Sequence, residues 1–368
     1  MSYYIIPKNN NNIEIDPRID DTHINIITSY SMFHFYDDLR DQLLRLLTIQ
    51  PNDISFNEIE QIYKEFNPHE YIYSKVPGSK YSVSKLKTKS NLFYEFFEIF
   101  NTLNCFDIFK HTNLKVAYFG NNYTDITDCF GLIRENKEDN IVRCYENIIF
   151  HKDKYDFFFF ELEDNLLDNL NLDLNQYVIY LIKNIIKILN HQINNGICII
   201  QLNHLFHQPI VELIYIITSL FEKTYVIKPN SSNITDFTKY LVCKFFITND
   251  SKTELYKYYS SKLNELLFHY LKESSSSKNI VSILNISLPY YFLNKMDDIN
   301  VIIGQQQLEC LDQIINIFKN NSNKKERLDY IRKINIQKAV HWCEKFKIPC
   351  NKFLEKTNIF LPIVKVEL

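Results

Sequence analysis

Hydrophobic runs of strand length alternate with helix-period segments through the middle of the chain. Apolar runs occupy residues 197–202, 225–228 and 240–247, and residues 209–223 place apolar side chains at helical spacing behind a first-turn proline. This alternation predicts an α/β unit built on a sheet.

The same pattern continues upstream. Residues 114–119 and 155–161 read as strands, and residues 141–145 with 147–150 are candidates for a further strand and its approach. Amphipathic periodicity predicts six more helices, at residues 31–47, 56–66, 92–103, 177–189, 254–271 and 305–318.

Composition narrows the class of protein. The 368 residues suffice for one large domain or two small ones, and 28 Phe and 25 Tyr stand against only 5 Gly. Residues with A/T-rich codons dominate, which suggests an A/T-rich genome such as that of a large DNA virus or a protist. The net charge of −3 gives no general attraction to nucleic acid, so any such binding needs a local patch.

Several classes of protein and site are disfavoured. No apolar span approaches the ~20 residues of a membrane helix and no signal-type segment opens the chain, so we expect a soluble intracellular protein without a membrane partner. The 8 cysteines include no Cys-x-x-Cys pair, which favours reduced core thiols. No phosphate loop, serine elbow or kinase signature is present.

A lysine-rich segment precedes the third predicted helix. It carries no acidic residue and interleaves lysines with Tyr73 and Tyr81, a pattern that suits phosphates and stacked bases. The alternative is a solvated loop. The candidate RNA-binding residues are Lys75, Lys80, Lys85, Lys87 and Lys89.

Two later segments carry a family resemblance. FEKTYVIKP at residues 221–229 and KYLVCK at residues 239–244 resemble the "Tyr-Glu-Lys-Val-Tyr-Ile-Ile-Lys-Pro" and "Lys-Tyr-Val-Val-Cys-Lys" segments of the FtsJ-like (RrmJ-type) ribose 2'-O-methyltransferases. YDFFFFE at residues 155–161 is similar to that family's "Tyr-Asp-Leu-Ile-Thr-Ser-Asp", and WCEKFKIP at residues 342–349 to a carboxyl-terminal segment of giant-virus relatives.

The resemblance implies a Rossmann-like methyltransferase fold, α/β, with a mixed, mostly parallel seven-stranded sheet flanked by helices. It implies a helical and loop extension over residues 1–89, the methyltransferase-fold domain over residues 90–250 and a mainly helical extension over residues 251–368.

The resemblance also locates the chemistry. The family's Lys-Asp-Lys-Glu catalytic tetrad falls on Glu95, Glu161, Gln201 and Thr238. Both lysines are lost, so no cation remains at these positions to favour a ribose alkoxide.

The cofactor loop differs independently. The family's Gly-x-Pro-Gly-Gly type loop, which approaches S-adenosylmethionine, corresponds here to GNNYTDI at residues 120–126. Gly120 remains, Asn121 and Asn122 follow it, and Tyr123, Thr124 and Asp125 or their neighbours replace the Pro-Gly-Gly element. Glycine serves close backbone approach and positive φ, and asparagine supports only the turn.

Two hypotheses follow. The first is a catalytically degenerate protein that binds RNA, or that supports a protein partner in viral mRNA capping or polyadenylation, in the host cytoplasm or the virion. It expects a cofactor pocket filled by Tyr123 or Phe160. The second is an active S-adenosylmethionine-dependent RNA 2'-O-methyltransferase with shifted residues, which expects a lysine beside Gln201 and an open pocket beside Gly120.

A histidine cluster is the remaining candidate for chemistry. His204 and His207, with His191 upstream, have a spacing that metal sites use. We interpret them instead as surface or capping histidines, and we expect no metal site.

Overall fold

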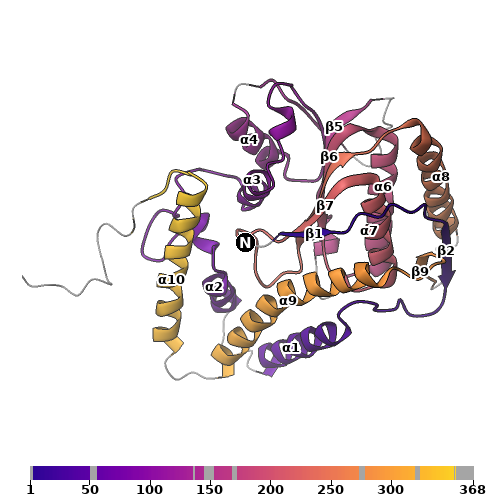
Figure 1. Ribbon diagram of the computed structural model, residues 1–368. Coiled ribbons are helices and arrows are strands. Elements are labelled where there is room, and N and C mark those ends of the chain that lie inside the picture. Colours follow the sequence, from indigo (N-terminus) through magenta and orange to yellow (C-terminus); the bar gives the residue numbers. More distant parts are fainter. Residues whose placement is uncertain are drawn as a thin grey trace, which may run out of the picture.

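The structure is a computed structural model, and it describes residues 3–49, 56–135, 137–144, 153–167, 172–272, 278–319, 324–351 and 353. Its centre is a seven-stranded sheet in the order β1-β7-β8-β6-β5-β3-β4 (Figure 1). The strands are β1 (Tyr3–Ile6), β3 (Lys115–Phe119), β4 (Asn140–Cys144), β5 (Tyr155–Phe160), β6 (Gln192–Leu202), β7 (Phe221–Ile227) and β8 (Lys239–Phe246).

The sheet is mixed and mostly parallel. β4, β3, β5 and β6 pair in parallel, whereas β8 is antiparallel to both β6 and β7, so β7 runs in the direction of β6. β1 pairs antiparallel with β7 at one edge. The protein is therefore α/β with a Rossmann-like arrangement, as the sequence predicts.

Helices cover both faces of the sheet. α3 (Leu92–Thr102) and α4 (Tyr123–Ile133) lie on one face, and α6 (Leu174–His191), α7 (Gln208–Leu220) and α8 (Asp250–Lys272) lie on the other (Figure 1). Phe158 and Phe160 join the core under α6, while Phe157 and Phe159 join the core under α3. Because both faces are buried, the four residues Phe157 to Phe160 of β5 form a continuous apolar run that does not alternate.

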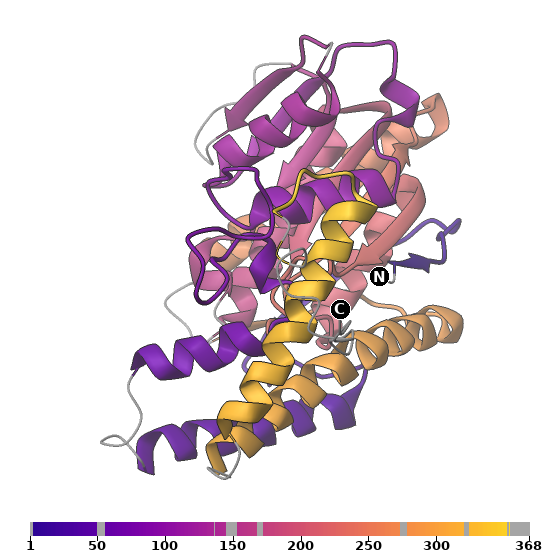
Figure 2. The same cartoon turned by 90° about the vertical axis from the view of Figure 1, so that its left-hand side faces the viewer.

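The two ends of the chain pack together beside this sheet. α1 (Tyr30–Ile49) lies along α9 (Tyr290–Lys319), and α2 (Phe56–Phe66) and the short helix η1 (Glu70–Ile72) contact α10 (Lys324–Lys345) (Figures 1 and 2). β2 (Ile15–Asp20) pairs antiparallel with β9 (Asn279–Leu284) as a separate two-stranded sheet. Two smaller elements are η2 (Asp107–Phe109) and α5 (Asp164–Leu167).

Most predicted elements are confirmed, with three kinds of difference. β1, β2, β9, α4, α10 and the short elements η1, η2 and α5 were not predicted individually, and α9 begins at Tyr290, well before residue 305. The predicted helix at residues 209–223 ends at Leu220, because the chain enters β7 at Phe221. The candidate segment at residues 147–150 lies outside the described residues.

Two further observations concern the whole described chain. Seven cysteines are buried and Cys350 is partly buried, which confirms the prediction of core thiols. Within the described ranges, no helix combines the length and the apolar character that crossing a membrane requires.

Candidate functional site

One glycine and three polar residues follow the carboxyl ends of parallel strands. Gly120 follows β3, Glu161 follows β5, Asn203 follows β6 and Lys228 follows β7. In open α/β sheets this edge is where ligands bind. The predicted cofactor loop and several predicted catalytic positions therefore lie at the edge that the fold makes available.

A three-residue turn, Gly120 to Asn122, connects β3 to helix α4. Asn122 is the N-cap residue of α4, and Tyr123, Thr124 and Asp125 form the first helical turn. Interpreting Tyr123 and Thr124 as part of an extended cofactor loop was therefore wrong. With a three-residue connection, the N–H groups of Asn121 and Asn122 become the donors at the helix N-terminus.

The Glu161 carboxylate occupies the space in front of these donors. Its Oε2 accepts hydrogen bonds from the backbone N–H groups of Asn121 (2.9 Å) and Asn122 (3.1 Å). Oε2 also accepts from the Tyr118 hydroxyl, and Oε1 accepts from the Asn122 side-chain amide. A Cβ at Gly120 would collide with Oε2, so the carboxylate lies directly against this glycine.

Glu161 acts as an internal anion. A helix N-terminus binds anions through its free N–H groups and its dipole, and here a side chain of the same protein satisfies both. Glu161 is 7% exposed, so the contact is sealed from solvent. The positions predicted to bind cofactor, Gly120, Asn121 and Asn122, are engaged by the chain itself.

The expected blocking residues do not lie in this space. The Tyr123 hydroxyl donates to the Ile141 carbonyl (2.7 Å), and Phe160 is buried in the core under α6. The expectation that Tyr123 or Phe160 fills the cofactor pocket was wrong. It considered only the size of these side chains and not the negative charge that a helix N-terminus attracts.

A second network joins two of the four tetrad positions. The Tyr240 hydroxyl donates to Glu95 Oε2 (2.6 Å) and accepts from Gln201 Nε2 (3.4 Å). Gln201 Oε1 accepts from the Leu162 N–H (2.9 Å), and Glu95 Oε1 accepts from the Asn91 side chain (2.9 Å). The partners of Gln201 are therefore a phenol and a backbone amide, where the active-enzyme hypothesis expected a lysine.

Burial controls the charge of this network. Burial raises the pKa of Glu95 to about 7, although the Tyr240 hydrogen bond and Lys228 oppose the shift. Burial, together with Glu95, raises the pKa of Tyr240 well above its usual value. A hydrogen-bonded chain of a carboxyl, a phenol and an amide results, and it supplies no cation to a ribose hydroxyl.

The remaining tetrad position is held by its backbone. The Thr238 carbonyl accepts a hydrogen bond from Lys228 Nζ (2.9 Å), and the Asp236 carbonyl accepts another from the same nitrogen (2.7 Å). Lys228 thus secures the loop between β7 and β8. Glu161 forms its hydrogen bonds with Tyr118 and with the residues before α4, so the four positions do not share one hydrogen-bond network.

The lysine-rich segment lies at the surface. All five lysines, Lys75, Lys80, Lys85, Lys87 and Lys89, are exposed. Tyr81 is 65% exposed, but Tyr73 packs on Tyr94 and donates to Glu70 (2.7 Å), so it is not free to stack on a base.

A second stretch adds charge beside this segment. The Lys85 N–H donates to the Pro349 carbonyl (2.8 Å), and Ser84 forms a β-bridge with Cys350. The exposed Lys345 and Lys347 therefore precede a stretch that is anchored to the lysine-rich segment. Sequence reasoning missed this addition because the two stretches are far apart in the chain.

His204 and His207 are buried, so interpreting these two as surface residues was wrong, whereas His191 is partly exposed and its ring contacts the Asp153 carbonyl (3.0 Å). His204 is 7% and His207 is 6% exposed, and their rings lie 4.9 Å apart among Phe33, Phe206 and Phe237. His207 is the N-cap residue of α7, but its side chain makes no capping bond. Burial lowers the pKa of His207 to about 4.

Metal binding has no donor set in the part of the chain that the structure describes. No group of three or more His, Cys, Asp or Glu side chains there is placed to hold an ion.

A cavity beyond the carboxyl end of β7 was also missed. It is lined by Lys228 together with residues of α9, α10 and the 68–69 stretch, so no contiguous sequence signal marks it. A lysine directly after a buried strand was the one signal available.

The chain was compared with known proteins. No protein-family model matches it, and no curated protein matches it significantly.

Proposed function

We propose that this protein is an FtsJ-like methyltransferase-fold protein without methyl-transfer activity, serving as an RNA-binding or scaffold subunit in viral mRNA processing. The observation that carries the proposal is the Glu161 carboxylate on the N–H groups of Asn121 and Asn122. S-adenosylmethionine bound beside Gly120 would have to displace a buried carboxylate from its donors.

The tetrad positions support the same conclusion. Glu95, Tyr240 and Gln201 are joined by hydrogen bonds in the interior of the protein. None of these three side chains carries the positive charge that would stabilise a ribose alkoxide. The mixed, mostly parallel sheet agrees with the fold that the resemblance implies.

The RNA-binding role rests on the exposed lysines. The five lysines of the 75–89 segment, together with Lys345 and Lys347, form the basic surface on which we place the phosphate backbone. Because the net charge of the chain is −3, binding of the phosphate backbone requires a local basic surface such as this one, and it weakens steeply with salt.

The first experiment titrates S-adenosylmethionine and S-adenosylhomocysteine into the protein by calorimetry. We expect no saturable heat up to about 1 mM ligand. Saturable micromolar binding would contradict the proposal that the Gly120 loop does not bind S-adenosylmethionine, and it would support the active-enzyme hypothesis. Methyl-transfer assays on capped RNA would then test that hypothesis.

The second experiment measures binding to a single-stranded RNA by fluorescence anisotropy at two salt concentrations. The triple variant Lys85→Gln, Lys87→Gln, Lys89→Gln should lose at least roughly tenfold in affinity, because each lost phosphate contact removes released counterions. A matched control removes Lys257, Lys262 and Lys272 of α8, on the opposite side of the sheet. Equal losses in both triple variants would contradict the assigned surface and leave the scaffold role.

A further inference from the structure

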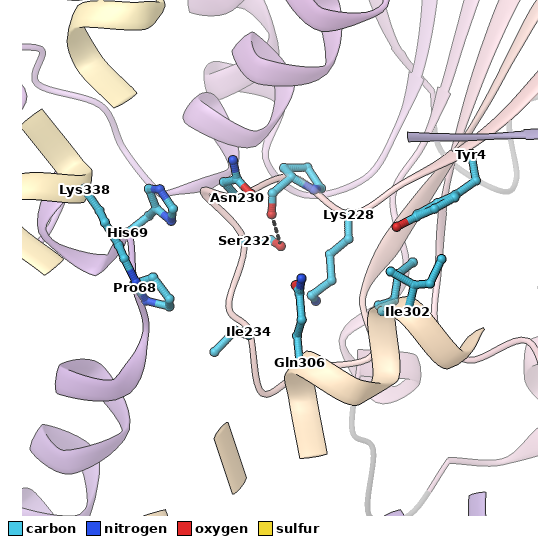
Figure 3. Close-up of a pocket in the computed structure, with 12 residues that line it drawn as sticks. Tyr4, Pro68, His69, Lys228, Asn230, Ser232, Ile234, Ile302, Gln306 and Lys338 are labelled. Carbon is cyan, nitrogen blue, oxygen red and sulfur yellow. Dashed lines mark hydrogen bonds between the residues drawn. The ribbon is translucent and has the colours of Figure 1, made fainter. Parts of the chain in front are cut away.

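A cavity opens where α9 and α10 pass the end of the central sheet (Figure 3). Its volume is about 290 Å³, close to the lower end of small-molecule sites. It is walled by β1, the 68–69 stretch, the loop after β7, α9 and α10. The lining residues are Tyr4, Pro68, His69, Lys228, Pro229, Asn230, Ser232, Ile234, Ile302, Ile303, Gln306 and Lys338.

The charge of the lining has one sign. Lys228 and Lys338 contribute two ammonium groups, and no acidic side chain lines the cavity. The side chains of Asn230, Gln306 and Lys338, which Figure 3 shows around the space, have no hydrogen-bond or ion-pair partner among the described residues. The lining of the cavity therefore offers several free donors and no carboxylate of its own.

Lys228 supplies a donor from the interior. Its Nζ bonds the carbonyls of Asp236 and Thr238, which leaves one of the three N–H groups of an ammonium for a ligand. Burial lowers the pKa of Lys228 to about 8, against the opposing influence of Asp236 and Glu95. A ligand anion would act in the same direction as Asp236 and Glu95 and favour the charged form of this amine further.

The loop that carries Asn230 is held in place without a ligand. Buried Glu98 accepts from the N–H groups of Asn230 (3.1 Å) and Ser231 (3.0 Å), and from Trp342 Nε1 (2.9 Å). This carboxylate joins α3, the loop and α10, so two walls of the cavity have a fixed spacing. Such pre-organisation favours binding of a small ligand.

We propose that this cavity binds a phosphate monoester of mononucleotide size. The phosphate lies between Lys228 and Lys338, where the amides of Asn230 and Gln306 donate to its oxygens. The organic part lies against Tyr4, Ile302 and Ile303. The phosphate belongs either to a free nucleotide or to the end of an RNA strand, and the site is independent of the Gly120 loop and of the lysine-rich segment.

The test is calorimetry with AMP, adenosine and inorganic phosphate on the full chain. We expect saturable binding of AMP, with adenosine at least roughly tenfold weaker because the two lysines recognise the phosphate. Lys338→Gln and Gln306→Glu should each weaken AMP binding at least tenfold, the second by placing a carboxylate in the cavity.

Matched controls separate the site from general surface charge. Lys333→Gln changes an exposed lysine of the same helix, and Gln305→Glu makes the same charge change at the neighbouring residue outside the cavity. Both should leave AMP binding unchanged. Absence of saturable binding by AMP and by a 5'-phosphorylated trinucleotide, or equal weakening in variants and controls, would overturn the proposal.

Two further measurements distinguish the source of the phosphate and test the role of Lys228. Tighter binding of the 5'-phosphorylated trinucleotide than of AMP assigns the site to an RNA end, and the reverse order assigns it to a free nucleotide. At pH 8, binding measured in two buffers should show uptake of roughly 0.5 proton as Lys228 becomes fully charged. The charged groups that act on this amine are Glu95, Asp236 and Lys239, and His69 and Lys338 line the same cavity. Because the uptake accompanies binding, it should disappear at AMP concentrations at which Gln306→Glu no longer binds.

Discussion

The Glu161 carboxylate does for the N-terminus of α4 what a bound anion does in other α/β proteins. It takes the backbone N–H groups of Asn121 and Asn122, and the Tyr118 hydroxyl donates to the same oxygen. Because Glu161 is part of the chain, it is always present at high effective concentration. An outside anion has to compete with it at every encounter.

Gly120→Ala tests this close contact at the residue scale. The new Cβ would collide with Glu161 Oε2, so the substitution should lower the free energy of unfolding by roughly 2 kcal/mol. In a Glu161→Gly background, which removes both the carboxylate and the Glu161 Cβ that would lie 2.5 Å from the new carbon, the same change should cost less than about 1 kcal/mol, and urea unfolding of the four proteins gives the coupling. Additive costs would show that the carboxylate does not lie against Gly120.

Glu95→Gln tests the buried carboxyl. The folded pKa of about 7 lies above the ordinary value of 4.5, so the folded state holds a proton that the unfolded state has released between these values. The contribution of Glu95 to stability is complete below pH 4.5 and is lost as pH rises through about 7, by up to roughly 3 kcal/mol.

Urea unfolding between pH 4 and 9 measures this dependence as the difference between wild type and Glu95→Gln. The difference should favour the variant increasingly up to about pH 7 and then level off. A difference that does not change with pH would mean that Glu95 titrates normally in the folded protein.

At the scale of elements, α10 is held by two buried carboxylates from different parts of the chain. Glu65 of α2 accepts a two-pronged contact from Arg332 (2.8 and 2.6 Å), and Glu98 of α3 accepts from Trp342. Both glutamates are nearly inaccessible to solvent. An α10 of mainly polar sequence is therefore docked by specific charges as much as by its apolar residues.

Arg332→Met should weaken this docking. Glu65 would remain buried with only the Tyr71 hydroxyl to compensate its charge, which costs roughly 3 kcal/mol. Trp342 is the single tryptophan of the chain, so its fluorescence in a urea titration reports α10 directly. We expect the fluorescence transition to precede the loss of far-ultraviolet circular dichroism.

Lys64→Met provides the control. It removes an ion pair with Glu60 in which both side chains are 50% exposed, and such pairs contribute about 0–1 kcal/mol. If Arg332→Met lost no more stability than Lys64→Met, the buried pair would not be what holds α10.

At the scale of the whole molecule, the two ends of the chain close the structure together. β1 completes the edge of the central sheet beside β7, and β2 pairs with β9. α1 lies along α9, and α2 contacts α10. The segments before and after the centre of the chain therefore pair with each other at several places around the central sheet.

Deleting residues 1–6 tests the contribution of β1. The deletion would leave β7 as an unprotected edge strand, and its Phe-Glu-Lys-Thr-Tyr-Val-Ile sequence would offer free backbone groups to other chains. We expect a lower midpoint of unfolding and concentration-dependent association in light scattering. Lys8→Met, which removes only an exposed ion pair with Glu222, should do neither. A monomeric truncated protein of unchanged stability would assign β1 no protective role.

The central fold was predictable because its signals are local. Continuous apolar runs such as residues 157–160 mark strands buried on both faces, and the helical spacing of residues 209–220 marks the helix that covers them. β2 was not predicted because Pro17 lies within it, and a proline argues against a strand except at the edge of a sheet. α4 escaped because the resemblance assigned its first turn to a loop.

The site was predictable only in part. The sequence identified the edge of the sheet and the loss of both family lysines, but the meeting of Glu161 with Asn121 depends on the register of β3 against β5. Lys228, Lys338 and Gln306 come from three separate elements, and only packing brings them to one cavity. Contacts of this kind have no periodicity for a sequence pattern to detect.

The pairing of β1 with β7 and of β2 with β9 has a consequence for synthesis on the ribosome. Both early strands emerge long before their partners, which are made only after most of the central sheet. Until then their unpaired edges and apolar side chains remain exposed to the cell. The nascent chain should therefore depend on chaperones until β9 has left the exit tunnel, and its final folding step should be slow because it joins distant segments.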